Sequence, residues 1–87
     1  MAQIILQLII LRLPTLIERS GLARSTIYKL ITVGLWTRPI RLSARAVGWP
    51  SSECEAILGA RVAGKTDDEI RALVVTLEAA REAGPHE

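Results

Sequence analysis

The 87-residue sequence has a single cysteine, Cys54, and a single histidine, His86. One cysteine excludes a disulfide framework and a cysteine-built zinc site, and it fits a reducing cytoplasm, where we expect the protein to act. His86 has no partner at the spacing of a metal site or a catalytic triad. Ser/His/Asp, Cys/His, Walker and dinucleotide-binding patterns are absent too. We therefore predict no enzyme activity, no metal and no cofactor.

The sequence also lacks an apolar run long enough to cross a bilayer, which takes roughly 20 residues. Its most apolar stretch, the opening "MAQIILQLIILRL", is interrupted by Gln7. It has no basic region before it and no small-residue cleavage site after it, so we do not expect a signal peptide. We interpret residues 1–10, the N-terminal arm, as an apolar packing arm or a buried strand, and we expect no membrane association.

Acidic residues are almost missing from the first part of the sequence. Residues 1–50 contain seven Lys or Arg against Glu18 alone, a net charge of +6, and no Asp or Glu lies between Arg19 and Pro50. Residues 51–87 contain four basic and eight acidic residues, a net charge of −4. This division predicts that the first part binds a polyanion and that the second part faces away from it.

Two short helices are predicted before the middle of the chain. In "PTLIERS", Pro14 suits the first turn of a helix, because its missing N–H would be unpaired there anyway, and Gly21 is the usual residue just past a helix end. A second helix spans about residues 23–33 and ends at Gly34. Its start is poorly capped, because Ala23 stands where Ser, Thr, Asp or Asn would accept a free backbone N–H.

The segment "RPIRLSARAVGWP" predicts a small β-hairpin that ends at Pro50. Pro39 favours an edge position, and "IRL" and "AVGW" are short β-capable runs. The predicted loop contains Ser43, Ala44 and Arg45. We expect Trp36 and Trp49 to pack on the apolar face of the hairpin rather than stack on bases, because large rings dominate small cores.

Two capping boxes predict the starts of two further helices. Ser52 and Glu55 have this spacing, and so do Thr66 and Glu69. The predicted inner face of the first of these helices consists of Cys54, Ile57, Leu58 and Val62, with Cys54 as an inert buried thiol. Three acidic residues favour the first turn of the last helix: Asp67, Asp68 and Glu69. Helix capping explains them without a metal site.

The last helix carries an apolar stripe and is predicted to stop at Gly84-Pro85. The stripe consists of Ile70, Leu73, Val74 and Leu77. An 87-residue chain has little core to spare for a fourth helix, so we predict that the stripe mediates homo-oligomerisation, as a dimer or as a head-to-tail assembly on DNA. The N-terminal arm could add to that interface. The alternative is that the stripe packs on its own domain.

The order of these elements predicts a mainly helical fold, a winged helix-turn-helix over residues 11–63 followed by an additional helix in residues 64–87. The second helix would enter the major groove of DNA, which accommodates one α-helix. The predicted DNA contacts are Arg24, Ser25, Thr26, Tyr28 and Lys29 on that helix and Arg41, Ser43 and Arg45 on the wing. Thr32 is a weaker candidate. For Tyr28 a half-buried ring with a solvated hydroxyl is the alternative to a phosphate contact.

These residues carry a family resemblance. "RLP", "SGLARSTIYKLI" and "RAVGW" followed by a Ser-Glu helix start resemble the AlpA-type prophage regulators, small MerR-like DNA-binding proteins, over about residues 11–63. The resemblance implies control of mobile-element genes, or excisionase-like assistance to an integrase. Three positions depart from the family pattern: Ala23 replaces the usual Ser, Thr37 stands where Pro is common, and Ile57 replaces a frequent Trp.

Two functions of different classes follow from the sequence. The main hypothesis is a sequence-specific regulator or excisionase-type factor that binds double-stranded DNA, with an integrase as a further candidate partner. The alternative is a protein-interaction adaptor or antirepressor that uses the N-terminal arm and the last helix and does not bind DNA directly. Binding to duplex DNA that weakens steeply with salt would distinguish the first from the second.

Overall fold

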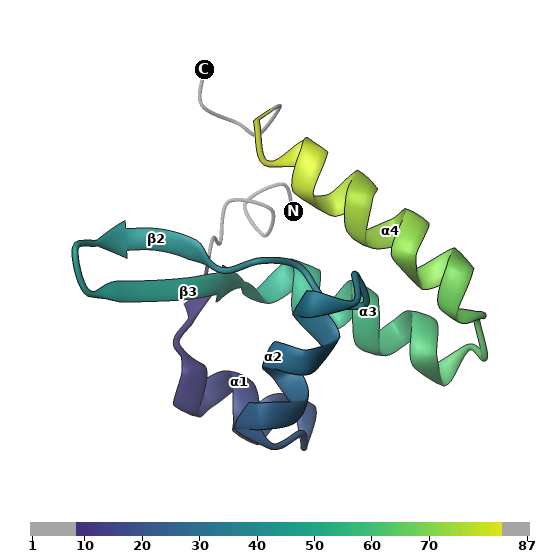
Figure 1. The fold of residues 1–87 in the computed structure, drawn as a ribbon, viewed down its shortest axis with the longest axis horizontal. Helices are drawn as coiled ribbons and strands as arrows, with labels where there is room; N and C mark the ends of the chain where they lie inside the picture. The colour runs from purple at the N-terminus through teal and green to yellow at the C-terminus, as the bar shows by residue number, and fades with distance from the viewer. Residues whose placement is uncertain (1–8, 83–87) are drawn as a thin grey trace, which may run out of the picture.

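The computed structural model describes residues 9–82, and within them the fold is mainly helical. The elements in chain order are β1 (Ile10–Leu11), α1 (Leu13–Ser20), α2 (Arg24–Thr32), β2 (Ile40–Ser43), β3 (Ala46–Pro50), α3 (Ser51–Val62) and α4 (Asp67–Ala80). The β2–β3 hairpin projects to one side, the wing, while α4 lies along α3 on the other side (Figure 1). This arrangement confirms the predicted winged helix-turn-helix. Most of the N-terminal arm lies outside the described residues.

The helix-turn-helix is bounded by the proline and glycines that predicted it. Pro14 occupies the first turn of α1, and Gly21 follows the helix in the left-handed conformation, with φ of 73°. The N–H of Gly21 donates to the carbonyl of Ile17 at 2.9 Å. Ala23 is the N-cap of α2 and makes no side-chain hydrogen bond, as predicted, and Gly34 follows α2 with φ of 82°.

The sheet has three strands, because β1 pairs with the outer side of the hairpin. The strand order is β1-β3-β2, and both pairings are antiparallel. Leu11 lies opposite Trp49 in the β1–β3 pair. Ser43 pairs with Ala46, so the turn of the wing is shorter than predicted. A side chain at Gly48 would collide with Ile10 and the carbonyl of Leu11, so this close strand approach requires glycine.

The core lies where α1, α2, α3 and α4 meet the base of the hairpin. Its buried apolar residues are Leu11, Leu16, Ile27, Leu35, Trp36, Trp49, Cys54, Ile57, Ile70 and Val74. The predicted packing role of both tryptophans is confirmed, and Trp49 Nε1 donates to the Thr37 carbonyl at 2.9 Å. Cys54 is buried, as predicted, and burial raises the pKa of its thiol although the charge of Arg19 opposes this, which disfavours the reactive thiolate.

The start of α3 differs from the prediction. α3 begins at Ser51, Pro50 is its N-cap, and no side chain caps it, so the capping box at Ser52 and Glu55 is wrong. The physical reason is that β3 runs directly into the helix. The N–H of Ser51 donates to the Ile9 carbonyl at 2.8 Å, so a backbone carbonyl next to β1 satisfies this donor instead of a capping side chain.

The predicted inner face of α3 is correct except at its end. Cys54 and Ile57 are buried and Leu58 is half-buried, but Val62 is 89% exposed. α4 returns along the side of α3 that carries Ala60, which together with Ala72 and Leu73 lines a hollow between the two helices. Residues 60 and 62 lie about 200° apart around a helix, so Val62 points to the opposite side.

The capping box that opens α4 is confirmed. Thr66 Oγ1 accepts the N–H of Glu69 at 3.1 Å, and Glu69 Oε1 accepts the N–H of Thr66 at 2.8 Å. The hydrogen bond from the Thr66 backbone lowers the pKa of Glu69. α4 ends at Ala80, before the predicted stop at Gly84-Pro85, which lies outside the described residues.

The apolar stripe of α4 is covered by its own chain. Ile70 and Val74 are buried in the core, and Leu73 and Leu77 pack against it half-buried. The stripe therefore packs on its own domain, which is the alternative that the sequence left open, because α3 leaves an apolar face that α4 completes. A role of Ile70, Leu73, Val74 and Leu77 between copies is not tested by a single chain. Homo-oligomerisation by another surface stays a prediction.

A network of four charged residues joins the end of α4 to the segment between α2 and β2. Arg81 contacts Glu53 through two hydrogen bonds, Nη2 to Oε1 at 2.7 Å and Nε to Oε2 at 2.8 Å. Glu78 accepts the backbone N–H of Arg38 at 2.8 Å and its guanidinium at 3.2 Å. Burial alone would raise the pKa of Glu78, but the hydrogen bonds from Arg38 and the charges of Arg38 and Arg81 lower it.

Candidate nucleic-acid interface

One face of α2 is buried and the other presents hydrogen-bond donors. Ile27 is fully buried, and Leu30 and Ile31 pack half-buried against the core. The five predicted contact residues of the helix are all exposed: Arg24, Ser25, Thr26, Tyr28 and Lys29. These five residues span about 200° of the circumference of α2, and we call the exposed surface that they cover the donor face. Their contact with DNA stays a prediction.

Tyr28 combines the two alternatives that the sequence left open for its ring. The ring packs edge-to-face against Trp49, with 6.5 Å between the centroids and an interplanar angle of 67°, yet the residue is 39% exposed. Since Trp49 belongs to β3, this contact fixes the donor face of α2 against the base of the wing. The ring therefore packs on Trp49 while the residue stays exposed, and a contact of its hydroxyl with phosphate stays a prediction.

Thr32 is the one neutral donor of α2 that the helix itself engages. Its hydroxyl donates to the backbone carbonyl of Tyr28 at 3.0 Å. A threonine in mid-helix commonly makes this bond to the carbonyl four residues earlier. Because the hydroxyl is already used, Thr32 is a poorer DNA ligand than Ser25 or Thr26, in agreement with its lower ranking from the sequence.

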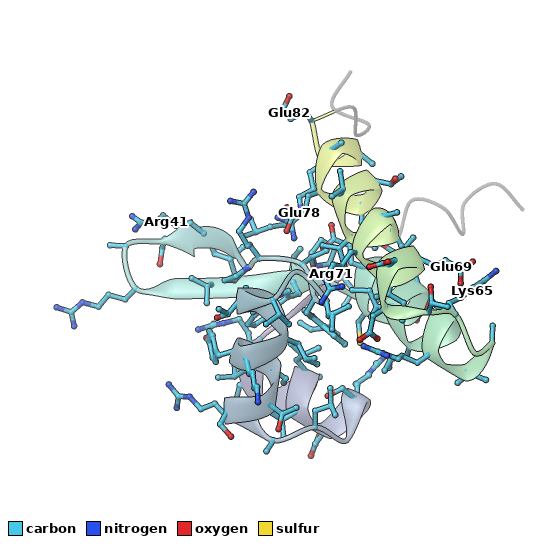
Figure 2. The ribbon with its side chains drawn as sticks, turned by 45° about the vertical axis from the view of Figure 1, so that its right-hand side comes forward. Arg41, Lys65, Glu69, Arg71, Glu78 and Glu82 are labelled. Atoms are coloured by element: carbon cyan, nitrogen blue, oxygen red, sulfur yellow. The ribbon has the colours of Figure 1, made fainter. Side chains whose placement is uncertain are left out.

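The wing carries its predicted residues on the surface. Arg41 lies on the edge strand β2, Ser43 ends that strand, and Arg45 lies in the turn, and all three are exposed. Figure 2 shows Arg41 on the projecting hairpin, away from the side of the molecule where Lys65 and Glu69 mark the α3–α4 end. The wing therefore extends basic side chains beyond the body of the domain.

The ion pairs of the described chain divide the arginines into two groups. Residues 9–82 contain four salt bridges: Arg38–Glu78, Arg61–Asp67, Arg71–Asp68 and Arg81–Glu53. Every acid in them belongs to α3 or α4, and two of the four cations, Arg61 and Arg71, do as well, while Arg81 directly follows α4. The acidic half thus neutralises its own arginines, whereas Arg24, Lys29, Arg41 and Arg45 enter no salt bridge within that range.

Charge counting along the sequence could not identify which arginines already form hydrogen bonds or salt bridges within the folded chain. Arg38 lies within the acid-free segment, but Glu78 engages both its backbone and its side chain. Arg12 is another basic residue that the sequence argument left aside, and its Nε donates to the Val47 carbonyl at 3.0 Å. Both contacts join residues at least 35 positions apart, so no local pattern signals them.

Because no side chain caps the start of α2, a capping residue at position 23 should stabilise the fold. Ala23→Ser supplies a side-chain oxygen for a free N–H in the first turn, and a cap of this kind contributes about 0.5–2 kcal/mol. We expect the free energy of unfolding to rise by about 1 kcal/mol in urea denaturation.

Ala72→Ser, the same change inside α4, is the control and should be neutral or slightly destabilising. Equal behaviour of the two variants would show that the first N–H groups of α2 are already satisfied.

No group of three or more His, Cys, Asp or Glu within residues 9–82 could hold a metal ion. In the same range, no helix is long and apolar enough to cross a membrane. The donor face of α2 and the basic wing form a surface rich in N–H and O–H donors and without carboxylates of its own, which suits an anionic ligand.

Comparison with known proteins identifies relatives of the segment that contains this surface. The family model described as "Prophage CP4-57 regulatory protein (AlpA)" matches residues 9–62, from the start of the described chain to the end of α3. The chain is 40% identical over 55 residues to "Uncharacterized protein ORF88" of Enterobacteria phage P4. That alignment covers 63% of this chain and 62% of the phage protein. No solved structure matches significantly.

Proposed function

Because the chain belongs to the AlpA family of prophage regulatory proteins, we propose that it binds double-stranded DNA and regulates genes of a prophage or integrative element. The observation that carries the proposal is the distribution of charge in the folded chain. Within residues 9–82, the cations of the donor face and the wing enter no salt bridge, whereas Arg61, Arg71 and Arg81 of the acidic half are paired with acids. Unpaired cations on a projecting surface favour binding to phosphates.

In the proposed complex, α2 lies in the major groove and the wing follows the adjacent backbone. The major groove, about 12 Å wide, admits one α-helix, and Arg24 and Lys29 extend from the exposed face that would enter it. Arg or Lys can donate to the O6 and N7 atoms of guanine, while Ser and Thr hydroxyls contact phosphates or base edges. Arg41 and Arg45 would neutralise phosphates beside the groove.

The family resemblance also implies a second role, that of an excisionase-type factor. In that role the same DNA contacts would assist an integrase at the ends of the element. Either role requires binding and no covalent chemistry by this chain. The adaptor alternative is less well supported, because the apolar stripe that it would use on α4 is largely covered by the core of the same domain.

A salt series tests the proposed function directly. In gel-shift titrations of the full chain on duplex DNA, the logarithm of the affinity should fall linearly with the logarithm of the salt concentration, because bound cations leave the DNA when protein binds. Absence of binding at low salt would reject the proposal and favour the adaptor alternative.

The wing makes the first quantitative prediction of this proposal. In the double variant Arg41→Ala/Arg45→Ala, the salt slope should decrease by about one unit for each lost phosphate contact. Arg61→Ala/Arg71→Ala, which removes the same number of cations from the acidic half, should leave the slope unchanged. Equal slopes for the wing variant and the wild type would show that the hairpin points away from DNA.

A further inference from the structure

Arg12 lies at the junction between the wing and the helix-turn-helix. It follows β1 directly and is the N-cap of α1, in an extended conformation, and its carbonyl accepts the N–H of Leu16 at 2.9 Å. Figure 1 shows the link from β1 to α1 passing between the hairpin and the two-helix unit. Arg12 therefore stands where the chain passes from the sheet into the two-helix unit.

The side chain of Arg12 replaces a missing strand contact. The β1–β3 pairing covers only Leu11 opposite Trp49 and Ile10 opposite Pro50, after which the chain turns away into α1. Further along β3, the carbonyl of Val47 accepts a hydrogen bond from Arg12 Nε at 3.0 Å. The Arg12 side chain thus satisfies a β3 carbonyl beyond the point where the backbone pairing of β1 ends.

The same contact places Arg12 level with the wing's DNA-binding candidates. Val47 of β3 is the pairing partner of Arg41 in β2, and its carbonyl accepts the bond from Arg12. Arg12 and Arg41 therefore lie on the two sides of the same β3 residue. The guanidinium of Arg12 is exposed, and only its Nε is engaged in the described chain. No acid occupies the first turn of α1 either. The two terminal nitrogens therefore remain available to an anion in a geometry fixed by the Val47 bond.

We propose that Arg12 binds a backbone phosphate of DNA while its Nε holds the wing, so that one guanidinium sets the angle between the wing and the recognition helix on the duplex. This proposal rests on the proposed function. It commits Arg12 to two bonds at once, which a planar guanidinium with five N–H donors allows and a lysine ammonium at the end of a flexible stem does not reproduce.

The experiment compares Arg12→Gln, Arg12→Lys and Arg61→Gln with the wild type, as full chains on mixed-sequence duplex DNA across 50–200 mM salt, a range in which phosphate contacts dominate binding. Arg12→Gln should reduce the slope of log affinity against log salt by about one unit. Between 50 and 200 mM salt, the fold-loss of affinity should therefore be about four times smaller for this variant than for the wild type. Arg61→Gln changes the net charge equally but lies on the acidic half, and it should retain the wild-type slope. Arg12→Lys should retain the slope and bind more weakly.

Three results would overturn the inference, and one would reject its premise instead. A wild-type slope for Arg12→Gln, with only a lower melting temperature, would mean that Arg12 is a structural brace without a phosphate contact. Equal reductions for Arg12→Gln and Arg61→Gln would mean a general charge effect. Wild-type affinity for Arg12→Lys would remove the orienting role of the Val47 bond. Failure of the wild type to bind at low salt would reject the proposed function itself.

Discussion

The variant Arg81→Ala is expected to lose about 3–5 kcal/mol of the free energy of unfolding, because it leaves the carboxylate of Glu53 buried without its cation. Glu53 is 4% exposed, and Arg81 contacts both of its oxygens at 2.7 and 2.8 Å. The hydrogen bonds that Arg81 donates to Glu53 correspondingly raise the pKa of Arg81 above its ordinary value. Since small domains have about 5–15 kcal/mol of stability in total, urea denaturation should show a large shift in midpoint.

Two companion variants separate a buried pair from an ordinary one. Arg61→Ala removes an exposed pair with Asp67 and should cost no more than about 1 kcal/mol. The double variant Glu53→Gln/Arg81→Ala replaces the unpaired buried charge by a neutral amide and should recover part of the loss. Similar losses for Arg81→Ala and Arg61→Ala would contradict the description of Glu53 as a desolvated carboxylate that depends on Arg81.

The Glu53–Arg81 pair also connects α4 to the candidate interface. Arg81 Nη2 donates to the Arg38 carbonyl at 2.6 Å, and Glu78 accepts the Arg38 N–H at 2.8 Å. Arg38 lies in the segment that leads from α2 to the wing. The family match ends at Val62, so this network joins the matched segment to a helix beyond it. α4 thus completes the core and also fixes the connection between the two predicted DNA-binding elements.

Local chemistry in the sequence predicted most of the fold. Pro14, Gly21 and Gly34 mark helix boundaries because each fits only a narrow range of backbone conformations, and all three predictions were confirmed. The Thr66–Glu69 capping box was confirmed, because its hydrogen bonds join residues three positions apart. The exposure of the donor face likewise follows from helical spacing, which places Ile27 inside and its polar neighbours outside.

Contacts between distant residues explain what the sequence could not predict. The Ser52–Glu55 pattern has the spacing of a capping box, but β3 runs directly into α3 and the chain near Ile9 satisfies a free N–H. Ile70 and Val74 were assigned to an interface between copies because the pattern of α4 does not show which surface will cover it. For the candidate site, the bond of Arg12 to Val47 depends on strand pairing between segments 35 residues apart.

The recognition helix carries the largest expected effect on DNA binding. Arg24→Ala and Lys29→Ala should each weaken binding by about 1–3 kcal/mol if the side chain contacts a guanine edge, and the double variant should lose both contributions. Both side chains are exposed on α2 and neither belongs to the buried core, so the fold should remain intact. The measurement is the affinity of each variant for a duplex selected by the wild-type protein from a random library.

The same variants distinguish a base contact from a phosphate contact. Loss of a base contact weakens binding to the selected duplex more than to a scrambled one, whereas loss of a phosphate contact weakens both equally and reduces the salt slope. Thr32→Ala is the matched control on the same helix, because its hydroxyl already donates to the Tyr28 carbonyl and its removal should change affinity little. Wild-type affinity in both Arg24→Ala and Lys29→Ala would show that α2 is not the recognition helix. The basic wing would then have to carry the binding without it, which a surface of two or three arginines could do only weakly and without sequence preference.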